Sequence, residues 1–476
     1  MSELHEHRIC NNNVLTIASL LPYNNSVLTD IVNAIEDRSA RGIAAALGRM
    51  ITSGTVPTGT RLPTVRALSR SLGVSPTTVS EAWQTLGAVG AIDSRGRLGT
   101  FVSQPVGPGG QLRYRRVTEG PGRFALDLST GTPDPDLLPD LPRVIAMVSG
   151  QSLTSSYLDQ PVLPALEEAL RSSWPFVPQK ITVVDGAMDA LDRVAQVVVR
   201  LGDRVVVEHP TFPPLLDLLE LIGAEVIGVA LDDEGISVEG LRAALLLQPS
   251  AVFLQPRAHN PTGITMSASR CAVISAVLAS STAIIVEDDH SGDIASGTLV
   301  SVGTTLPEQT VHIRSFSKSH GPDLRLAAIG GAGHVVSAVA NRRLIGPGWS
   351  SRILQAVLVT MLQDSTTIAQ LGNARDEYAR RRELVTSVLT GRAIPYTGSD
   401  GINLWMRVGD ERSALITLAA QGVGAAPGEP FMVRPTSEHS LRLTVGLLNG
   451  SDSEIAATAD RLVDAAGFTA TRSGQR

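Results

Sequence analysis

The chain has 476 residues, more than one typical hydrophobic core requires, so we expect it to divide into domains. Its 43% hydrophobic and 18% charged residues are typical of a folded protein and exclude disorder as its main character. The formal net charge is −6, no apolar stretch is suited to cross a membrane, and the N-terminus lacks a secretory signal, so we expect a cytoplasmic protein.

Basic residues are concentrated near the N-terminus. Residues 38–116 contain eleven arginines against only Glu81 and Asp93, inside a chain that is acidic overall. Such an excess is expected where a protein neutralises the phosphates of a nucleic acid, although a solvated arginine-rich face would look the same. The charge pattern therefore leaves nucleic-acid binding and a solvated face as two open interpretations.

Helical patterns follow an N-terminal extension, residues 1–27, to which the sequence assigns no role. Apolar residues recur at helical spacing over residues 28–53, where we expect the first helix, ended by Gly54. A second, short helix is predicted from about Pro63 to Gly73. The sequence thus predicts a small helical domain over residues 28–103.

A third helix is predicted to begin at Ser75, an N-cap that precedes a first-turn proline. Val79, Trp83 and Leu86 are expected on its buried face. Two short strands then flank the basic tip at residues 94–99, which is typical of a wing. A helix, a glycine turn and a helix with hydroxyl residues in its first turn favour major-groove binding, with a generic three-helix module as the alternative.

Three strings carry a resemblance to a known family: LPTVRAL at residues 62–68, LGVSPTTV at residues 72–79 and GTFV at residues 99–102. They closely resemble the winged helix-turn-helix of GntR-type bacterial regulators. The resemblance implies double-stranded operator DNA as the partner. The residues that it places against DNA are Arg66, Ser75, Thr77 and Thr78, with Arg95 and Arg97 from the wing.

A connector rich in glycine and proline is predicted at residues 104–123, followed by a large domain over residues 124–476. In the large domain, continuous valine and isoleucine runs alternate with helical patterns, beginning with the strand at residues 180–184 and the helix at residues 187–200. This alternation predicts an α/β fold whose mainly parallel central sheet is covered on both faces.

Polar groups follow several of the predicted strands. Gly186 and Ala187 form a strand-to-helix turn that could bind an anion, although such turns are common. Asn260 begins the turn Asn-Pro-Thr-Gly, and Asp288 ends a buried strand where ligands of α/β proteins bind. A solvated acidic loop is the alternative interpretation for Asp288.

The chain contains only two lysines, Lys180 and Lys318. A protein that holds a carbonyl cofactor covalently through a side chain needs a lysine, because arginine forms no Schiff base. Lys180 precedes a predicted strand and is expected to be exposed. Lys318 follows a strand in a hydroxyl-rich loop, seven residues before Arg325, and is the better candidate.

Residues 124–468 resemble fold-type I, class I aminotransferases, most specifically in the Asn-Pro-Thr-Gly turn, the Asp288 strand end and the Ser-Phe-Ser-Lys loop. With the GntR-type head, the chain resembles the MocR/GabR subfamily of regulators. The resemblance implies pyridoxal 5'-phosphate bound as an aldimine of Lys318, with Asp288 on the pyridine nitrogen, Asn260 on the ring oxygen and Phe212 stacked on the ring. It places Gly186, Ala187, Ser315, Ser317 and Arg325 around the phosphate and Arg442 on an effector carboxylate.

One residue departs from the aminotransferase pattern. The family usually has tyrosine two residues after the aspartate, where this chain has His290. The contact to the ring oxygen is therefore in doubt, although an imidazole could donate a hydrogen bond there. Cofactor binding is expected to survive this change better than rapid transamination.

Three functions follow from these observations. The first is a transcription regulator whose body senses the cofactor or an amine or amino acid, working as a head-to-tail homodimer on two DNA half-sites. The second is an active aminotransferase with a tethering DNA-binding head. The third is a regulator whose body has lost the cofactor and serves only for dimerisation.

Overall fold

The computed structural model describes residues 25–52, 54–88, 92–102, 113, 124–148, 156 and 159–467. The chain separates into two compact units, residues 1–110 and residues 111–476. Most of the predicted connector, residues 104–123, lies outside the described residues, as does most of the extension, residues 1–27. The domain limits named above therefore stay a prediction.

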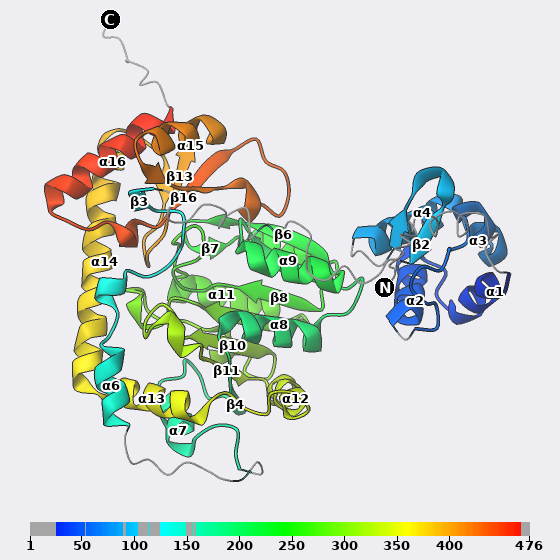
Figure 1. Cartoon of the computed structure of the whole chain (residues 1–476), viewed down its shortest axis with the longest axis horizontal. Coiled ribbons are helices and arrows are strands. Elements are labelled where there is room, and N and C mark those ends of the chain that lie inside the picture. The colour runs from blue at the N-terminus through cyan, green and yellow to red at the C-terminus, as the bar shows by residue number, and fades with distance from the viewer. Residues whose placement is uncertain are drawn as a thin grey trace, which may run out of the picture. The chain divides into compact units, whose positions relative to one another are not determined.

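The smaller unit combines helices with a two-stranded antiparallel sheet (Figure 1). Its described elements are α1 (Asn25–Ala34), α2 (Ala40–Thr52), α3 (Val65–Leu72), α4 (Pro76–Ala88), β1 (Ile92–Ser94), the 3-10 helix η1 (Gly96–Leu98) and β2 (Thr100–Val102). The two strands pair from Ile92 with Val102 to Ser94 with Thr100, so the predicted wing is present.

The prediction of one helix over residues 28–53 is wrong, because α1 and α2 are separated at residues 35–39. Asp37 and Ser39 explain the break, since their side chains accept backbone N–H groups that a continuous helix would bond internally. The Ser39 N–H donates to Asp37 Oδ1 at 2.9 Å, and the Gly42 N–H donates to Ser39 Oγ at 3.0 Å. Ser39 therefore caps a second helix.

Helix α3 begins and ends as predicted, and α4 begins as predicted. Thr64 Oγ1 accepts the Ala67 N–H at 3.2 Å at the start of α3, and Gly73 ends α3 with a φ of 70°. Ser75 Oγ accepts the Thr78 N–H at 3.0 Å at the start of α4. All four helices pack on one core, which includes the predicted buried residues Val79, Trp83 and Leu86.

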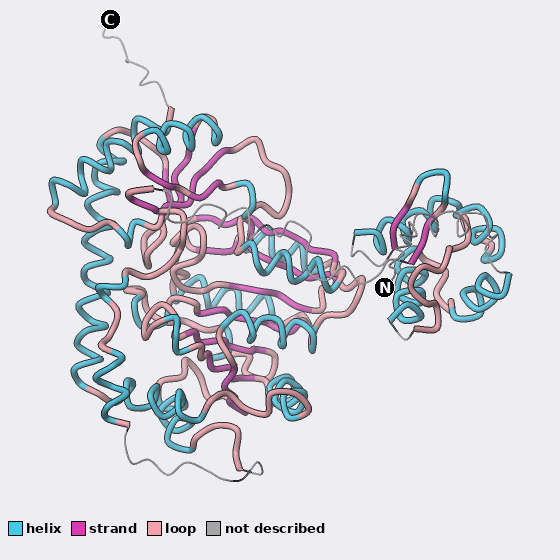
Figure 2. Tube along the Cα trace, viewed as in Figure 1, coloured by secondary structure: helices cyan, strands magenta, loops and turns pink. Residues whose placement is uncertain are grey.

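An eight-stranded sheet forms the centre of the larger unit (Figures 1 and 2). In spatial order its strands are β4 (Lys180–Val184), β11 (Ala327–Gly331), β10 (Thr310–Ser315), β9 (Ile284–Asp289), β8 (Ala251–Leu254), β5 (Arg204–His209), β6 (Glu225–Asp232) and β7 (Gly235–Ile236). The five strands from β10 to β6 are parallel neighbours, which confirms the mainly parallel sheet.

Helices cover both faces of this sheet because its strands are apolar on both sides. Val205 and Val207 of β5 pack on one core, and Val206 between them packs on another. The helices of the first core are α8 (Ala187–Val198), α9 (Pro213–Ile222) and α12 (Gly333–Leu344). The second core contains α10 (Val238–Leu245) and α11 (Ala268–Leu278), and a third contains α6 (Leu141–Met147), α7 (Pro164–Ser172) and α13 (Arg352–Gln363).

A second lobe of the larger unit follows the long helix α14 (Ser365–Gly391), which Figure 1 shows along one side of the unit. Its four-stranded sheet has the order β12 (Tyr396–Thr397), β13 (Leu404–Val408), β16 (His439–Leu443) and β15 (Ala426–Pro427). A two-stranded parallel pair joins β14 (Val423–Gly424) to β3 (Leu126–Asp127), and the remaining α-helices are α15 (Glu411–Ala420) and α16 (Asp452–Ala466).

Short 3-10 helices connect these elements: η2 (Pro135–Leu137), η3 (Gly292–Ile294), η4 (Val302–Thr304), η5 (Pro322–Leu324), η6 (Glu429–Phe431) and η7 (Val445–Leu447). In the part of the chain that the structure describes, no helix is long and apolar enough to cross a membrane.

Candidate functional site

A cavity of about 200 Å³ lies where the carboxyl ends of β5, β8, β9 and β10 meet residues from the second lobe. Parallel strands place their carboxyl ends at one edge of a sheet, which is where ligands of α/β proteins bind. The cavity contains every body residue singled out from the sequence except Gly186: Ala187, Phe212, Asn260, Asp288, His290, Ser315, Ser317, Lys318, Arg325 and Arg442.

Lys318 and His290 contact each other on one wall of the cavity. Phe316, fully buried, anchors the loop after β10 that carries Lys318. Lys318 Nζ lies 2.6 Å from His290 Nδ1. Burial lowers the pKa of Lys318 to about 7, against the opposing effect of Asp288, and burial also lowers the pKa of His290. A lysine with this pKa is partly unprotonated near neutral pH and can act as a nucleophile.

Asp288, the last residue but one of β9, has one carboxylate oxygen bound and one free to receive a ligand. Its Oδ2 accepts the Gln255 Nε2 donor at 2.7 Å, whereas its Oδ1 is buried with no hydrogen-bond partner among the described residues. Burial raises the pKa of Asp288 to about 6, and the Gln255 hydrogen bond and Lys318 oppose that rise. Asp288 is thus an acceptor for a buried cation or N–H group.

The turn at Gly186 and the Arg325 guanidinium form the end of the cavity that suits an anion. Gly186 is the N-cap of α8, so the first N–H groups of that helix are available to a negatively charged group. Gly186 has a φ of 106°, and a Cβ there would lie 2.9 Å from Arg325 Nη2. Arg325 in turn donates to the Asp185 carbonyl at 3.1 Å, and fully buried Arg343 binds the Asp185 carboxylate.

Arg442 of β16 brings a buried guanidinium from the second lobe to the same cavity. Its Nη1 donates to Asn260 Oδ1 at 3.4 Å, its Nη2 donates to the Ser129 carbonyl, and its plane lies 5.3 Å from the Phe431 ring centre. The side-chain oxygen of Asn260 therefore already accepts a hydrogen bond from Arg442. The position suits a carboxylate, the group that guanidinium binds in bidentate fashion.

Sequence analysis missed eight residues that line the cavity: Thr130, Gly131, Thr132, Met188, Leu191, Pro213, Gln255 and Phe431. Gln255 directly follows an apolar strand, as a polar residue at a strand end, and that pattern could have identified it. Thr130, Gly131 and Phe431 reach the cavity from short loops in distant parts of the sequence. No local pattern marks them, because only the packing of the two lobes brings them there.

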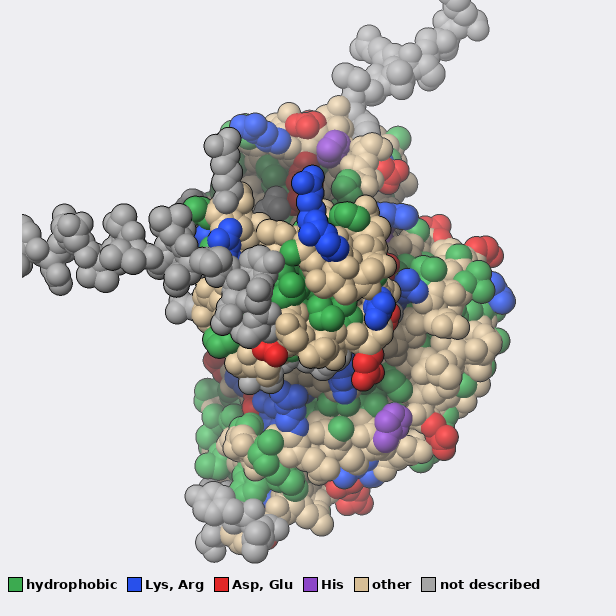
Figure 3. Space-filling view, turned by 90° about the vertical axis from the view of Figure 1, so that its right-hand side faces the viewer, with side chains coloured by type: hydrophobic (Ala, Val, Ile, Leu, Met, Phe, Trp, Pro, Cys, Tyr) green, Lys and Arg blue, Asp and Glu red, His purple; other side chains and the backbone are tan. Residues whose placement is uncertain are grey.

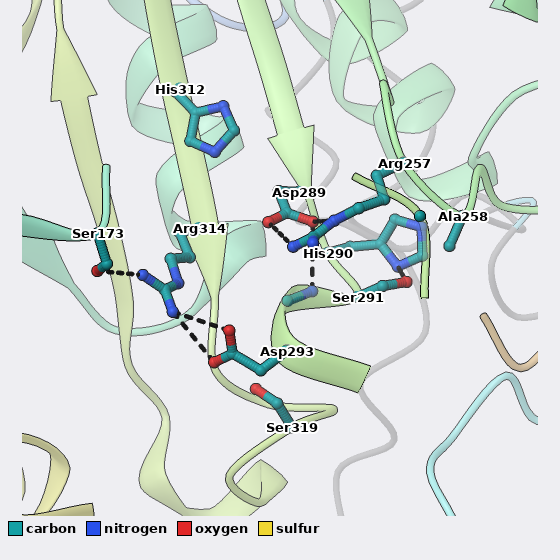
Figure 4. Close-up of polar contacts among 12 residues, drawn as sticks. Ser173, Arg257, Ala258, Asp289, His290, Ser291, Asp293, His312, Arg314 and Ser319 are labelled. Carbon is teal, nitrogen blue, oxygen red and sulfur yellow. Dashed lines mark hydrogen bonds and ion pairs between the residues drawn. The ribbon is translucent and has the colours of Figure 1, made fainter. Parts of the chain in front are cut away.

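Buried acidic and basic side chains surround the cavity. Arg257 donates to Asp289 through two nitrogens, at 3.2 and 2.7 Å, beside His290 (Figure 4). The 3-10 helix η3 follows. There, Arg314 Nη2 donates to both carboxylate oxygens of Asp293, each at 3.0 Å. The residues that link Asp289 to Asp293 are thus held at both ends by ion pairs.

The pKa of buried Glu208 gives a stability prediction. Burial raises this pKa from 4.5 to about 8, with a smaller effect of Asp288 in the same direction and an opposing backbone hydrogen bond from Gln255. The folded state therefore binds the Glu208 proton more tightly than the unfolded state does, so this contribution to stability is complete below about pH 4.5 and is lost as the pH rises through about 8.

Glu208→Gln is therefore expected to flatten the fall in the free energy of unfolding between about pH 5 and pH 8. Urea unfolding of both proteins at a series of pH values measures it. Parallel curves for the two proteins would contradict the assignment of a buried, neutral Glu208.

The candidate DNA contacts lie on the smaller unit. Arg66, Ser75 and Thr77 are exposed and Thr78 is partly exposed, at the start of α3 and α4. Arg95 in the wing is 58% exposed, pairs with Asp93 at 2.8 Å and lies 5.2 Å from the Phe101 ring centre. The Arg97 side chain lies outside the described residues.

Lys and Arg side chains appear in separate places rather than in one continuous patch on the face drawn in Figure 3. The helix-turn-helix and its wing define the candidate DNA surface. A winged helix-turn-helix joined to an α/β unit with a lysine at its strand ends defines a class of protein: a DNA-binding regulator with an enzyme-like body.

Comparisons with known proteins give the same two parts. Residues 39–102 match the family described as bacterial regulatory proteins, gntR family, and residues 125–462 match the family of class I and II aminotransferases. The chain therefore belongs to the GntR-type regulators that carry a class I and II aminotransferase domain, the arrangement of the MocR/GabR subfamily.

Two curated relatives are transcription regulators. The chain is 34% identical over 429 residues to the vitamin B6 salvage pathway transcriptional repressor PtsJ of Salmonella typhimurium, a match that covers 88% of this chain and 97% of that protein. It is 28% identical over 426 residues to the HTH-type transcriptional regulator TauR of Rhodobacter capsulatus, covering 80% and 87% of the two chains. The protein is therefore a transcription regulator with an aminotransferase-like domain.

Solved structures show the fold of the larger unit. The α-aminoadipate aminotransferase LysN of Thermus thermophilus matches with a TM-score of 0.66 and 21% identity, over 74% of this chain and 94% of that chain. The aspartate aminotransferase of Thermus thermophilus with maleate matches with a TM-score of 0.64 and 21% identity, over 74% and 95%. The body thus has the fold-type I aminotransferase architecture.

Proposed function

We propose that the body binds pyridoxal 5'-phosphate in the cavity at the strand ends, attached to Lys318, and that this binding alters how the head engages operator DNA. The single observation that carries the proposal is the meeting of Lys318, Asp288 and the Gly186–Arg325 anion site in one cavity. Each has the chemistry that one part of the cofactor requires: an amine, an acceptor and an anion site.

The cavity fits the cofactor on three observations. Asp288 Oδ1 is a buried acceptor without a partner among the described residues, which the protonated ring nitrogen would satisfy. Gly186 lets the Arg325 guanidinium lie against the start of α8, because a Cβ there would come within 2.9 Å of Arg325 Nη2, and this cation and the first N–H groups of α8 together suit a phosphate. Phe212, the N-cap of α9, lines the cavity where a ring could stack.

Pyridoxal phosphate, when bound, supplies an aldehyde to which an amine can attach and a ring that withdraws electrons. The chain's own residues would orient the cofactor and hold the amine that attaches to it. Lys318 presents an amine with a lowered pKa, and Ser315, Ser317 and Arg325, which line the cavity, would hold the phosphate. His290 Nδ1 and Lys318 Nζ share a hydrogen bond of 2.6 Å, so the imidazole holds the amine in place.

His290 supports regulation rather than turnover. Burial and the neighbouring Lys318 keep its pKa low, so the ring is neutral and its Nδ1 is engaged with the lysine amine. Aminotransferases usually have a tyrosine at this position. A neutral imidazole whose Nδ1 is already bonded to the Lys318 amine is less able to donate a hydrogen bond to the ring oxygen than that tyrosine's phenol. We therefore propose that the body senses its ligand and does not turn over amino acids at enzymatic rates.

The effector that we propose is pyridoxal phosphate itself. The name of the relative PtsJ places that protein in the vitamin B6 salvage pathway, and the match covers nearly all of its length. An effector can shift the regulator only if it binds two conformations of the body unequally. A head-to-tail homodimer, with one head on each half-site of an operator, completes the proposal.

Fluorescence anisotropy with labelled DNA from the regulator's own promoter region tests this function. Pyridoxal phosphate is expected to change the affinity of the full chain for the DNA by roughly fivefold or more, the scale of typical coupling between two sites. Pyridoxal without the phosphate serves as the control ligand. An identical affinity with and without pyridoxal phosphate would rule out the cofactor as the effector.

Removal of one candidate phosphate contact gives a second prediction. Arg66→Gln is expected to weaken DNA binding on all sequences and to lower the slope of log K against log salt by about 1. Arg242→Gln, which changes an exposed arginine on α10 of the body, is the matched control. Equal salt slopes for Arg66→Gln and the unchanged protein would remove Arg66 from the DNA surface.

An active aminotransferase is the second candidate, and Arg442 in the cavity favours it because its guanidinium suits a substrate carboxylate. Stopped assays with a panel of amino acids and 2-oxoglutarate distinguish the two candidates. Turnover at about 1 per second or faster, within the ordinary range of enzymes, would favour the aminotransferase.

A further inference from the structure

Three buried polar side chains have no task in the proposed function: Gln255 lines the cavity, and Glu208 and His259 lie outside its lining. Their exposed fractions are 7% for Gln255, 2% for Glu208 and 1% for His259. Glu208 lies near the carboxyl end of β5, Gln255 directly follows the neighbouring strand β8, and His259 lies in the turn after β8. Asp288 is the last residue but one of the next strand, β9. Burying a polar side chain costs free energy unless it forms hydrogen bonds. Hydrogen bonds join Glu208 to the Gln255 backbone and the Gln255 side chain to Asp288, so these residues form a buried polar network.

Gln255 connects the two residues expected at the pyridine nitrogen and at the ring oxygen of the cofactor. Its Nε2 donates to Asp288 Oδ2 at 2.7 Å, and its Oε1 accepts the Asn260 backbone N–H at 2.9 Å. A backbone N–H can only donate, so it fixes which end of the amide is oxygen and directs the NH₂ group to Asp288. A glutamine side chain offers both the donor and the acceptor that these two contacts need.

Glu208 lies behind Gln255 and is neutral at physiological pH. Its Oε2 accepts the Gln255 backbone N–H at 2.8 Å and lies 3.4 Å from His259 Nε2. Burial raises the pKa of Glu208 to about 8 and lowers that of His259 to about 3, so both groups are uncharged near pH 7. A neutral Glu208 adds no negative charge beside Asp288.

We propose that Gln255 is a positioning residue for Asp288: its amide holds the carboxylate ionised and directed at the cavity, with a neutral Glu208 behind it. The inference rests on the proposed function, because Asp288 Oδ1 needs a ring nitrogen to bind. Without the Gln255 donor, burial acts on Asp288 with less opposition, its pKa rises above about 6, and the carboxyl is protonated over a wider pH range.

Gln255→Met, an uncharged change of similar size, tests this inference in the full chain. Pyridoxamine phosphate is the probe, since it has the same ring nitrogen but no aldehyde to react with Lys318. Its affinity is measured by quenching of intrinsic fluorescence from about pH 5.5 to pH 9. We expect the variant to bind at least about tenfold more weakly at pH 7, and the midpoint of the pH dependence to move up by about one unit.

Glu208→Gln is the matched control. It replaces a neutral acid by a neutral amide at a residue that contacts the Gln255 backbone. We expect its affinity for pyridoxamine phosphate to stay within about threefold of that of the unchanged chain, with the same midpoint. If thermal unfolding shows that Gln255→Met does not fold, Gln255→Asn replaces it. That variant keeps an amide but withdraws the donor from Asp288, so the midpoint shifts in the same direction.

The outcomes separate this inference from the proposed function. A folded Gln255 variant with unchanged affinity and midpoint overturns the inference alone, as does a Glu208→Gln variant that shifts as far as Gln255→Met. Failure of the unchanged chain to bind both pyridoxal phosphate and pyridoxamine phosphate overturns the proposed function together with the inference.

Discussion

Lys318→Ala is expected to abolish covalent attachment of pyridoxal phosphate, whereas Lys180→Ala leaves it intact. The chain has no other lysine, so the two variants test every side-chain amine that can hold the aldehyde. Lys318 faces the cavity beside His290 and has a pKa lowered to about 7. Lys180, at the exposed start of β4, donates instead to Ser337 Oγ at 3.1 Å.

The measurement combines absorption with mass spectrometry. The unchanged chain and Lys180→Ala are expected to show a visible absorption band with pyridoxal phosphate and to gain one cofactor mass after reduction with borohydride. Lys318→Ala is expected to show neither. A band and a mass increase that survive in Lys318→Ala would place the attachment elsewhere, and no band in any of the three would favour a body that has kept the fold without the cofactor.

Arg257→Met is expected to destabilise the body by about 3–5 kcal/mol, because it leaves a buried carboxylate without its partner. Arg257 is 8% exposed, and Asp289, which it binds through two nitrogens, is fully buried (Figure 4). Asp289 Oδ1 also accepts the Gly292 N–H at 3.2 Å, at the start of η3. The loss should therefore extend to the segment next to His290 and weaken cofactor binding as well.

Arg392→Met is the matched control for this variant. Arg392 pairs with Asp460 at 3.1 Å, but the two side chains are 60% and 52% exposed, so the loss is expected to stay below about 1 kcal/mol. Urea unfolding followed by circular dichroism measures both variants. The double variant Arg257→Met with Asp289→Asn should recover part of the stability, and equal losses in Arg257→Met and Arg392→Met would show that the buried pair is not special.

Most elements of the fold could be predicted because their causes are local. Thr64 and Gly73 delimit α3, and the valine run of β5 identifies a buried strand. The first helix was the exception, since its apolar spacing continues through a break made by Asp37 and Ser39. The spacing of apolar residues indicates which side of a helix is buried. It does not indicate whether one helix or two successive helices carry that spacing.

The second lobe and its share of the cavity were beyond sequence analysis. Its strands are short and pair antiparallel between distant segments, so no run of residues identifies the sheet. Arg442 was assigned to the cavity only through resemblance, and Gly131 and Phe431 were missed. These three residues reach the cavity only because one lobe packs on the other.

The sequence by itself determined the two-part design, the single well-placed lysine and the helix-turn-helix, because each is written in a short motif or a period of residues. Only the tertiary structure decided the electrostatics of the site. The lowered pKa of Lys318 and the raised pKa values of Asp288 and Glu208 arise from burial. The hydrogen bond from Gln255 to Asp288 arises from the register of the neighbouring strands β8 and β9. Burial and register depend on segments far apart in the chain, and no local pattern encodes them.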